Sequence, residues 1–121
     1  MEVVAVIGAS SDTNRYSYKA MEMLEEFGHR PIPVHPREEV ILGHQVIHQL
    51  SELNGKKIDT ITVYVNREIS DKYEEGIIQL APKRVIFNPG AENPRLARVL
   101  EDKGIKVENA CTLVLLRTGQ Y

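Results

Sequence analysis

The sequence contains little of several residues that mark specialised classes of protein. It has one cysteine, Cys111, and no tryptophan, and only 6% of its residues are aromatic. An internal disulfide is therefore excluded, which fits a reducing compartment such as the cytoplasm. The shortage of aromatic side chains argues against a stacking platform for single-stranded nucleic acid. No apolar run approaches the ~20 residues needed to cross a membrane, and the first residues lack a secretory signal pattern.

Charge of one sign is also scarce, because the formal net charge is only −2. No overall field therefore draws the protein to nucleic acid or to an anionic membrane, and any anion site must be built locally. The chain has 121 residues, of which 42% are hydrophobic. This length and composition predict one globular domain over residues 1–121, with a core that needs no disulfide or metal.

Strand-like and helix-like segments alternate along the chain. Helices are expected from Ser17, as the capping residue, to Gly28, over 67–80, and from Asn93 to Gly104, because apolar residues there recur at helical spacing. Residues 35–45 are expected to form a loop, and 46–55 a turn with a short helix. Residues 112–116 form a last apolar stretch. Strands are expected at 2–8, 30–34, 60–65, 84–87 and 105–107.

This alternation predicts an α/β fold, a Rossmann-like three-layer sandwich with a five-stranded, mainly parallel sheet. Right-handed crossovers leave few strand orders. The order 3-2-1-4-5 is expected, and the flavodoxin-like order 2-1-3-4-5 is the alternative. Ligands of such sheets bind at the carboxyl ends of the strands, at the switch point. The loops 8–17 and 88–93 are expected there, and each contains glycine and leads into a helix whose N-terminus favours an anion.

The first loop, GASSDTNRYS, differs from the known phosphate-binding motifs. The dinucleotide fingerprint needs three glycines, but its positions hold Gly8, Ser10 and Thr13, and no Gly-Lys-Ser/Thr of a P-loop follows. Gly8 permits close backbone approach, Ser10 supplies a hydroxyl, and Arg15 can pair with phosphate oxygens. These residues predict a phosphate site of another kind, although a solvated loop arginine is an equally ordinary role for Arg15.

The end of the second strand argues against NAD. An NAD site places an acidic residue there for the ribose hydroxyls, but this chain has His35, Pro36 and Arg37. Arg37 suits a phosphate instead, so NADP is less disfavoured than NAD.

Three further patterns favour ordinary structural roles. The two histidines of HQVIH, at 44 and 48, have the spacing of a zinc helix but lack its glutamate, so they are expected to be surface or turn residues. Ser10 lacks the second glycine of a nucleophile elbow, since Asp12 stands there and is expected to shape the turn. Cys111 is expected to be a buried, inert thiol, and the alternative is a thiol that lines the crevice.

The order of several motifs resembles the small CoA-binding family, stand-alone relatives of the CoA-binding domain in the alpha subunit of succinyl-CoA synthetase. The motifs are VIGAS with R-x-S at 15–17, IPVHPR at 32–37 with EEVILG after it, YVN at 64–66, NPGAEN at 88–93, and ENAC at 108–111. The chain departs from the family at VHPR, where V-N-P-K is typical, and at Asn88 and Pro89, where a glutamine is common before the glycine. It also has one extra residue between Asn109 and Cys111.

The resemblance implies that coenzyme A, or an acyl-CoA, binds at the switch point. Gly8, Ala9 and Ser10 would line the pyrophosphate, with Arg15 and Ser17 facing phosphates. Pro36 and Arg37 would flank the 3′-phosphate of the adenosine. The remaining edge of the ligand would be bordered by Val65, Asn66, Asn88, Pro89 and Gly90.

The resemblance supports binding and does not extend to catalysis. The synthetase forms its phosphohistidine in another domain, and the four histidines of this chain stand in no matching context. We therefore expect a binder of a small nucleotide ligand in the cytoplasm, without nucleic acid, membrane or metal, and a homo-oligomer stays open. The alternatives are an NADP-dependent oxidoreductase-like nucleotide binder and an interaction module that binds neither nucleotide.

Overall fold

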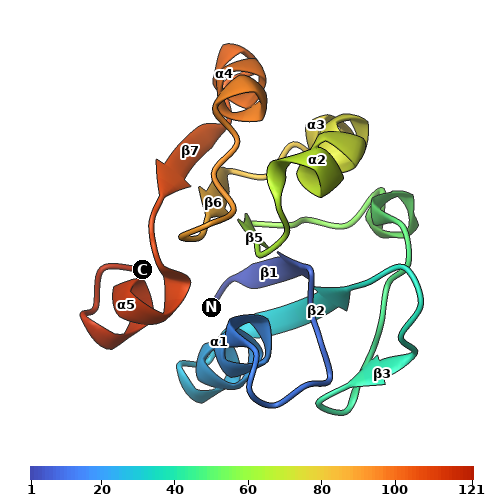
Figure 1. The fold of residues 1–121 in the computed structure, drawn as a ribbon, viewed down its shortest axis with the longest axis vertical. Helices are drawn as coiled ribbons and strands as arrows, with labels where there is room; N and C mark the ends of the chain where they lie inside the picture. The colour runs from blue at the N-terminus through green and yellow to red at the C-terminus, as the bar shows by residue number, and fades with distance from the viewer.

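A computed structural model describes all residues from Met1 to Tyr121 and has a parallel sheet of five strands at its centre (Figure 1). The α/β, Rossmann-like architecture expected from the alternating segments is confirmed. No helix is long and apolar enough to cross a bilayer. The strands of the sheet are β1 (Val3–Ile7), β2 (Arg30–Val34), β5 (Thr60–Val63), β6 (Arg84–Phe87) and β7 (Lys106–Asn109).

The strands lie in the order β2-β1-β5-β6-β7, and each pair of neighbours is parallel. Ile47 adds a one-residue parallel bridge to Val34 beside β2. If this bridge is counted as a minimal third strand, the segments at Ile47, β2, β1, β5 and β6 follow the expected order 3-2-1-4-5, and β7 comes after them. If only the five full strands are numbered along the chain, their order is 2-1-3-4-5. The segment 60–65, expected as the third strand, therefore lies beside β1 instead of beyond β2. The switch point lies between β1 and β5, with the loop after β6 beside it.

The prolines of β2 explain why only a minimal strand lies outside it. The N–H of Arg30 bonds to Glu2 on the β1 side, so the alternating residues Pro31 and Pro33 face the outer edge. Proline has no N–H to donate, which is why it is confined to edge strands. At this edge the N–H of Ile47 donates to Pro33 (2.9 Å), and the N–H of His35 donates to Ile47 (3.1 Å). The next full strand, β5, pairs with β1.

Helices cover both faces of the sheet, and the alternation of β1 divides the core between them. Val4 and Val6 face α1 (Tyr16–Glu26) and α5 (Thr112–Arg117), where they pack in one cluster with Met21, Leu24 and Leu116. The opposite face packs against η1 (Leu50–Leu53), α3 (Glu74–Leu80) and α4 (Pro94–Asp102). Figure 1 shows α1 and α5 on one side of the strands and α3 and α4 on the other.

Several helix boundaries follow the expected signals. Asn93 caps α4, since its side chain accepts a hydrogen bond from the N–H of Leu96 (3.0 Å), and Pro94 is the first helical residue. Gly28 follows α1 with φ of +84°, and the N–H of His29 bonds to Leu24 (2.8 Å). The expectation for Ser17 is wrong, because α1 begins at Tyr16 and Ser17 is buried in its first turn.

Two other segments differ from the sequence-based expectation. Residues 35–45, expected to be loop throughout, contain a small hairpin of β3 (Val40–Ile41) and β4 (His44–Gln45). Leu42 and Gly43 both have positive φ, the requirement of a tight two-residue hairpin turn, but Leu-Gly is a weak sequence signal for it.

The expected long helix over 67–80 is divided into α2 (Arg67–Ser70), η2 (Asp71–Tyr73) and α3. The amide of Asn93 donates to the carbonyl oxygen of Arg67 (3.3 Å) and to the side chains of Ser70 and Asp71 (both 2.8 Å) at the point of the break. Because this contact comes from a distant loop, the helical spacing of residues 67–80 does not reveal it.

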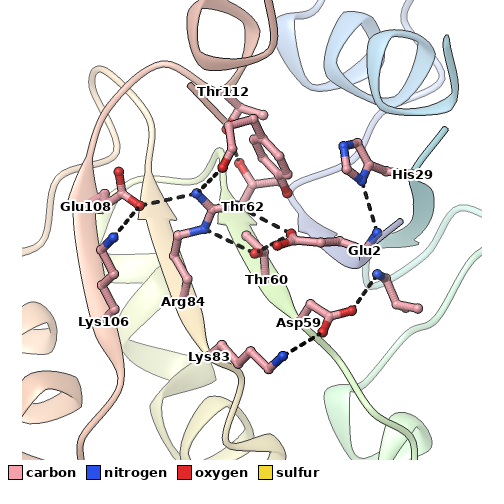
Figure 2. Close-up of polar contacts among 12 residues, drawn as sticks. Glu2, His29, Asp59, Thr60, Thr62, Lys83, Arg84, Lys106, Glu108 and Thr112 are labelled. Carbon is pink, nitrogen blue, oxygen red and sulfur yellow. Dashed lines mark hydrogen bonds and ion pairs between the residues drawn. The ribbon is translucent and has the colours of Figure 1, made fainter. Parts of the chain in front are cut away.

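A buried arginine organises the amino end of the sheet, opposite the strand ends where ligands bind. Figure 2 shows Arg84 between Glu2, Thr60 and Glu108. Its guanidinium lies 3.4 Å from Glu2 Oε1 and 3.3 Å from Glu108 Oε2, and it also donates to Thr60 Oγ1 (3.2 Å) and to the carbonyl oxygen of Tyr121 (2.9 Å). A buried charge is tolerated when it is paired in this way. Arg84 therefore has a structural role.

Candidate functional site

A cleft of ≈ 230 Å³ opens at the carboxyl ends of three neighbouring strands. The loops that follow β1, β5 and β6 meet there, as the strand order requires of a switch point. The residues that line the cleft are Gly8, Ser10, Arg15, Tyr16, Ser17, Tyr64, Val65, Asn66, Pro89, Gly90 and Ala91.

The N-terminus of α1 forms one wall of the cleft and is not capped by any side chain. Arg15 occupies the N-cap position without a capping hydrogen bond, and the first turn contains no acidic residue. The backbone N–H groups of Tyr16, Ser17 and Tyr18 have no acceptor within the protein. Such a helix end presents free donors and the positive end of the helix dipole. This wall of the cleft can bind an anion without any further change in the backbone.

Gly8 makes the turn from β1 into the cleft possible. Its φ is +87°, and a Cβ at this position would lie 2.7 Å from Cγ1 of Val65. We expected the missing side chain to let a ligand approach the backbone, but the space is already taken by Val65. Gly8 therefore allows the loop after β5 to pack against the loop after β1.

Asp12 fixes the conformation of the first loop, as its position in the turn predicted. Its N–H donates to Ser10 Oγ (3.0 Å), and its Oδ1 accepts from the N–H of Asn14 (3.0 Å). The side chain of Arg15 is 72% exposed and lies 3.8 Å from Asp12 Oδ2. An exposed pair of this kind is weak, so Arg15 can exchange Asp12 for a ligand anion.

The other two loops present backbone and amide groups. Asn66 caps α2 by accepting from the N–H of Ile69 (3.0 Å), which leaves its amide N–H₂ free. Asn88, Pro89, Gly90 and Ala91 form a tight turn, with Gly90 at φ +88° and a hydrogen bond from Ala91 N to Asn88 O (2.8 Å).

A second cavity of ≈ 450 Å³ adjoins the cleft. Tyr16, Tyr64 and Pro89 line both, and the second cavity adds Asn88, Cys111, Leu113, Val114 and Arg117. Its wall is mostly apolar, and burial raises the pKa of the Tyr64 hydroxyl to about 12. Cys111 is half-buried and lines this cavity, so the alternative of a crevice thiol, rather than a fully buried one, describes its place.

Eight of the twelve residues predicted to bind a ligand line the cleft: Gly8, Ser10, Arg15, Ser17, Val65, Asn66, Pro89 and Gly90. Tyr16, Tyr64 and Ala91 were missed. Tyr64 directly follows β5, and Tyr16 directly follows Arg15. Because these two tyrosines are next in sequence to predicted site residues or strand ends, their positions could have indicated that they line the cleft.

The remaining four predicted residues lie outside the cleft. Ala9 is fully buried and packs in the core beneath α1. Asn88 is also buried, and its side chain bonds to Thr62 Oγ1 (2.7 Å), to the carbonyl of Val63 (2.9 Å) and to the N–H of Thr112 (2.9 Å). These hydrogen bonds hold the loop after β6, and Asn88 lines the second cavity instead of the cleft.

Pro36 and Arg37 are exposed in the turn after β2. His35 holds this turn, because its Nδ1 accepts from the N–H groups of Arg37 and Glu38 (both 3.0 Å). Glu38 Oε2 accepts in turn from the N–H of Ser11 (3.3 Å), and this hydrogen-bonded serine lowers the pKa of the Glu38 carboxyl. The turn is thereby tied to the first loop through Glu38, and Arg37 lies outside the lining of the cleft.

The histidines of HQVIH do not share a helix. His44 lies on β4, where its Nε2 is 2.9 Å from Glu25, while Nε2 of His48 lies 3.0 Å from the carbonyl oxygen of Glu38. No three histidine, cysteine or acidic side chains gather closely enough to hold a metal ion.

Comparison with known proteins agrees with this geometry. The CoA binding domain family matches residues 2–117. The uncharacterized protein YneT of Bacillus subtilis is 26% identical over an alignment of 117 positions that covers 90% of this chain and 86% of that protein. The crystal structure of an uncharacterized protein superposes with a TM-score of 0.94 at 40% identity, over 100% of this chain and 98% of the other.

The fold also occurs as part of a larger enzyme. The dinucleotide-forming acetyl-coenzyme A synthetase 1 of Ca. Korarchaeum cryptofilum matches with a TM-score of 0.75 at 17% identity, over 88% of this chain and 25% of the synthetase. At that identity the match concerns the fold alone. Because the family match spans nearly the whole sequence, this chain belongs to the CoA binding domain family.

Proposed function

We propose that residues 1–121 form one domain that binds coenzyme A or an acyl-CoA in the cleft, and that this chain alone catalyses no reaction on it. The observation that carries the proposal is the uncapped N-terminus of α1, which has three free N–H groups and borders the cleft through Arg15, Tyr16 and Ser17. Coenzyme A has a pyrophosphate and a separate phosphomonoester, so it suits a helix N-terminus combined with scattered arginines. The family membership of the chain supports the same ligand.

Each group of the ligand has a candidate partner. We assign the pyrophosphate to the N-terminus of α1 with Ser10 and Arg15, and the 3′-phosphate to the exposed turn that contains Pro36 and Arg37. Val65, Asn66, Pro89 and Gly90 border the rest of the ligand. Ala9 supports the loop after β1 from within the core, and Asn88 supports the loop after β6 through its buried hydrogen bonds.

Binding without catalysis is supported by the state of the candidate nucleophiles. Ser10 Oγ accepts the Asp12 N–H, and no histidine or carboxylate is hydrogen-bonded to it. Cys111 has no hydrogen-bonded base either. A nucleophile needs an adjacent base or a lowered pKa to act. The single cysteine of the chain also supports the cytoplasm as its location.

Calorimetric titration with coenzyme A, 3′-dephospho-coenzyme A and NADP tests the proposal. We expect coenzyme A to bind best, and Arg15→Ala to weaken binding of both coenzyme A forms by about 1–3 kcal/mol, because a charge-assisted hydrogen bond is lost. Arg37→Ala should weaken binding of coenzyme A and leave dephospho-coenzyme A unchanged. Arg30→Ala is the matched control, because Arg30 is an exposed arginine at the amino end of β2, away from the cleft.

Other outcomes identify the alternatives. No binding of coenzyme A at millimolar concentration contradicts the proposal, and preference for NADP favours an oxidoreductase-like nucleotide binder. A protein that binds none of the three ligands is better explained as an interaction module. Unchanged affinity of Arg15→Ala removes the role given to Arg15.

A further inference from the structure

The N–H of Gly90 is a backbone donor on the wall of the cleft, and a side chain of the protein itself occupies it. The hydrogen bond of the turn 88–91 uses the N–H of Ala91, so the N–H of Gly90 has no main-chain acceptor. Glu92 Oε1 accepts it at 2.9 Å. The Glu92 side chain is exposed, so it can move into water and leave the N–H of Gly90 free for a ligand.

The carboxylate of Glu92 has no cationic partner. No lysine, arginine or histidine side chain lies within 4 Å of it, in contrast to Asp12 on the opposite loop, which lies beside Arg15. The unpaired negative charge of Glu92, next to the cleft-lining Gly90, opposes the entry of an anion into the cleft. The bond to Gly90 also occupies a donor that a phosphate oxygen could use.

We propose that Glu92 is a specificity-determining residue of the cleft: its carboxylate competes with an anionic ligand for the N–H of Gly90. This inference rests on the proposed function. A ligand with several phosphates, held by the N-terminus of α1, gains enough contacts elsewhere in the cleft to displace Glu92. A lone phosphate meets the same repulsion with fewer compensating contacts. The residue therefore lowers the affinity for every anion and excludes inorganic phosphate first.

The experiment compares two substitutions that separate charge from occupancy. Glu92→Gln removes the charge but keeps a side-chain oxygen that can accept the Gly90 N–H. Glu92→Ala removes both. Each variant and the wild-type protein are titrated with coenzyme A and with inorganic phosphate at low and high salt, and the ¹⁵N–¹H signal of Gly90 is followed by NMR. Glu101→Ala, an exposed carboxylate in the last turn of α4, is the control.

We expect Glu92→Ala to bind coenzyme A about three- to tenfold more tightly than the wild type, and Glu92→Gln to gain less. The Ala variant should retain its advantage over the Gln variant at high salt, because screening removes repulsion between charges but not competition for a donor. The Gly90 signal should shift in free Glu92→Ala, and coenzyme A should shift it in the wild type. Inorganic phosphate should bind measurably only to Glu92→Ala.

Three results would overturn the inference. Equal affinities of the Ala and Gln variants would reduce the effect of Glu92 to charge alone. Weaker binding by Glu92→Ala, with wild-type binding intact, would make Glu92 a support of the turn and would leave the proposed function standing. Absence of coenzyme A binding in the wild type and in both variants would overturn the inference and the proposed function together.

Discussion

Replacing Gly8 by alanine tests how the cleft is built. Gly8 combines a φ of +87° with a neighbour, Val65 Cγ1, only 2.7 Å from the position that a Cβ would take. The positive φ alone costs an alanine about 1–2 kcal/mol, and forcing a methyl group into an occupied space costs about 1–3 kcal/mol more. We therefore expect Gly8→Ala to lower the free energy of unfolding by about 2–5 kcal/mol.

Gly104 supplies a matched control for the backbone cost. Its φ is +83°, nearly that of Gly8, but a Cβ there would meet no atom of a non-adjacent residue within 4 Å. Gly104→Ala should therefore cost about 1–2 kcal/mol, the effect of the positive φ alone. Both variants are unfolded in urea and followed by far-ultraviolet circular dichroism.

The difference between the two variants measures the contact with Val65. It should shrink when Val65 is replaced by alanine, because this change removes the atom that the new methyl group meets, and a double-mutant cycle isolates the coupling. If Gly8→Ala costs no more than Gly104→Ala, the loops after β1 and β5 are not packed through this glycine and the reasoning is refuted.

Two further predictions concern the amino end of the sheet. The N–H of Val3 donates to the Asp59 carboxylate (2.8 Å), and this bond is the main reason that the pKa of Asp59 lies below its ordinary value. The stabilising effect of this hydrogen bond is therefore present above the unfolded-state pKa of Asp59 and is lost as pH falls through its folded-state pKa. The difference in urea midpoint between the wild type and Asp59→Asn should accordingly shrink below about pH 4. A difference that stays constant with pH would contradict this prediction. Arg84→Met should lower the free energy of unfolding by about 3 kcal/mol, because it leaves the Glu2 carboxylate without its cationic partner and Glu108 with the exposed Lys106 alone. Calorimetry should show unchanged affinity for coenzyme A, and a weaker affinity would contradict the separation of Arg84 from the cleft.

The fold class could be predicted from the sequence because it depends on local patterns. The apolar runs of β1 and β6, the helical spacing in α1 and the Asn93-Pro94 start of α4 are each visible within a short window. The position of β5 needed one step more. Pro31 and Pro33 are typical of an edge strand and would have placed the next full strand beside β1, but the expected order placed it beyond β2.

The candidate site was predictable to the level of loops but not of individual side chains. Sequence motifs identify which loops meet at the switch point, so most residues of those loops were found. They do not reveal which way a residue faces, and for this reason Ala9, which points into the core, was included and Tyr64 was missed. The hydrogen bonds of Asn88 to Thr62 and Thr112 depend on contacts between distant segments and have no local signal.

The prolines at the outer edge of β2 also bear on how copies of this protein meet one another. A sheet edge with free N–H and carbonyl groups can recruit a strand from a second molecule and so begin aggregation. At β2 this route is hindered, because Pro31 and Pro33 cannot donate and Ile47 already bonds to the carbonyl of Pro33 and the N–H of His35. The other edge, β7, is only four residues long and carries Lys106 and Glu108. The protein can therefore be concentrated with little tendency for its sheets to join edge to edge.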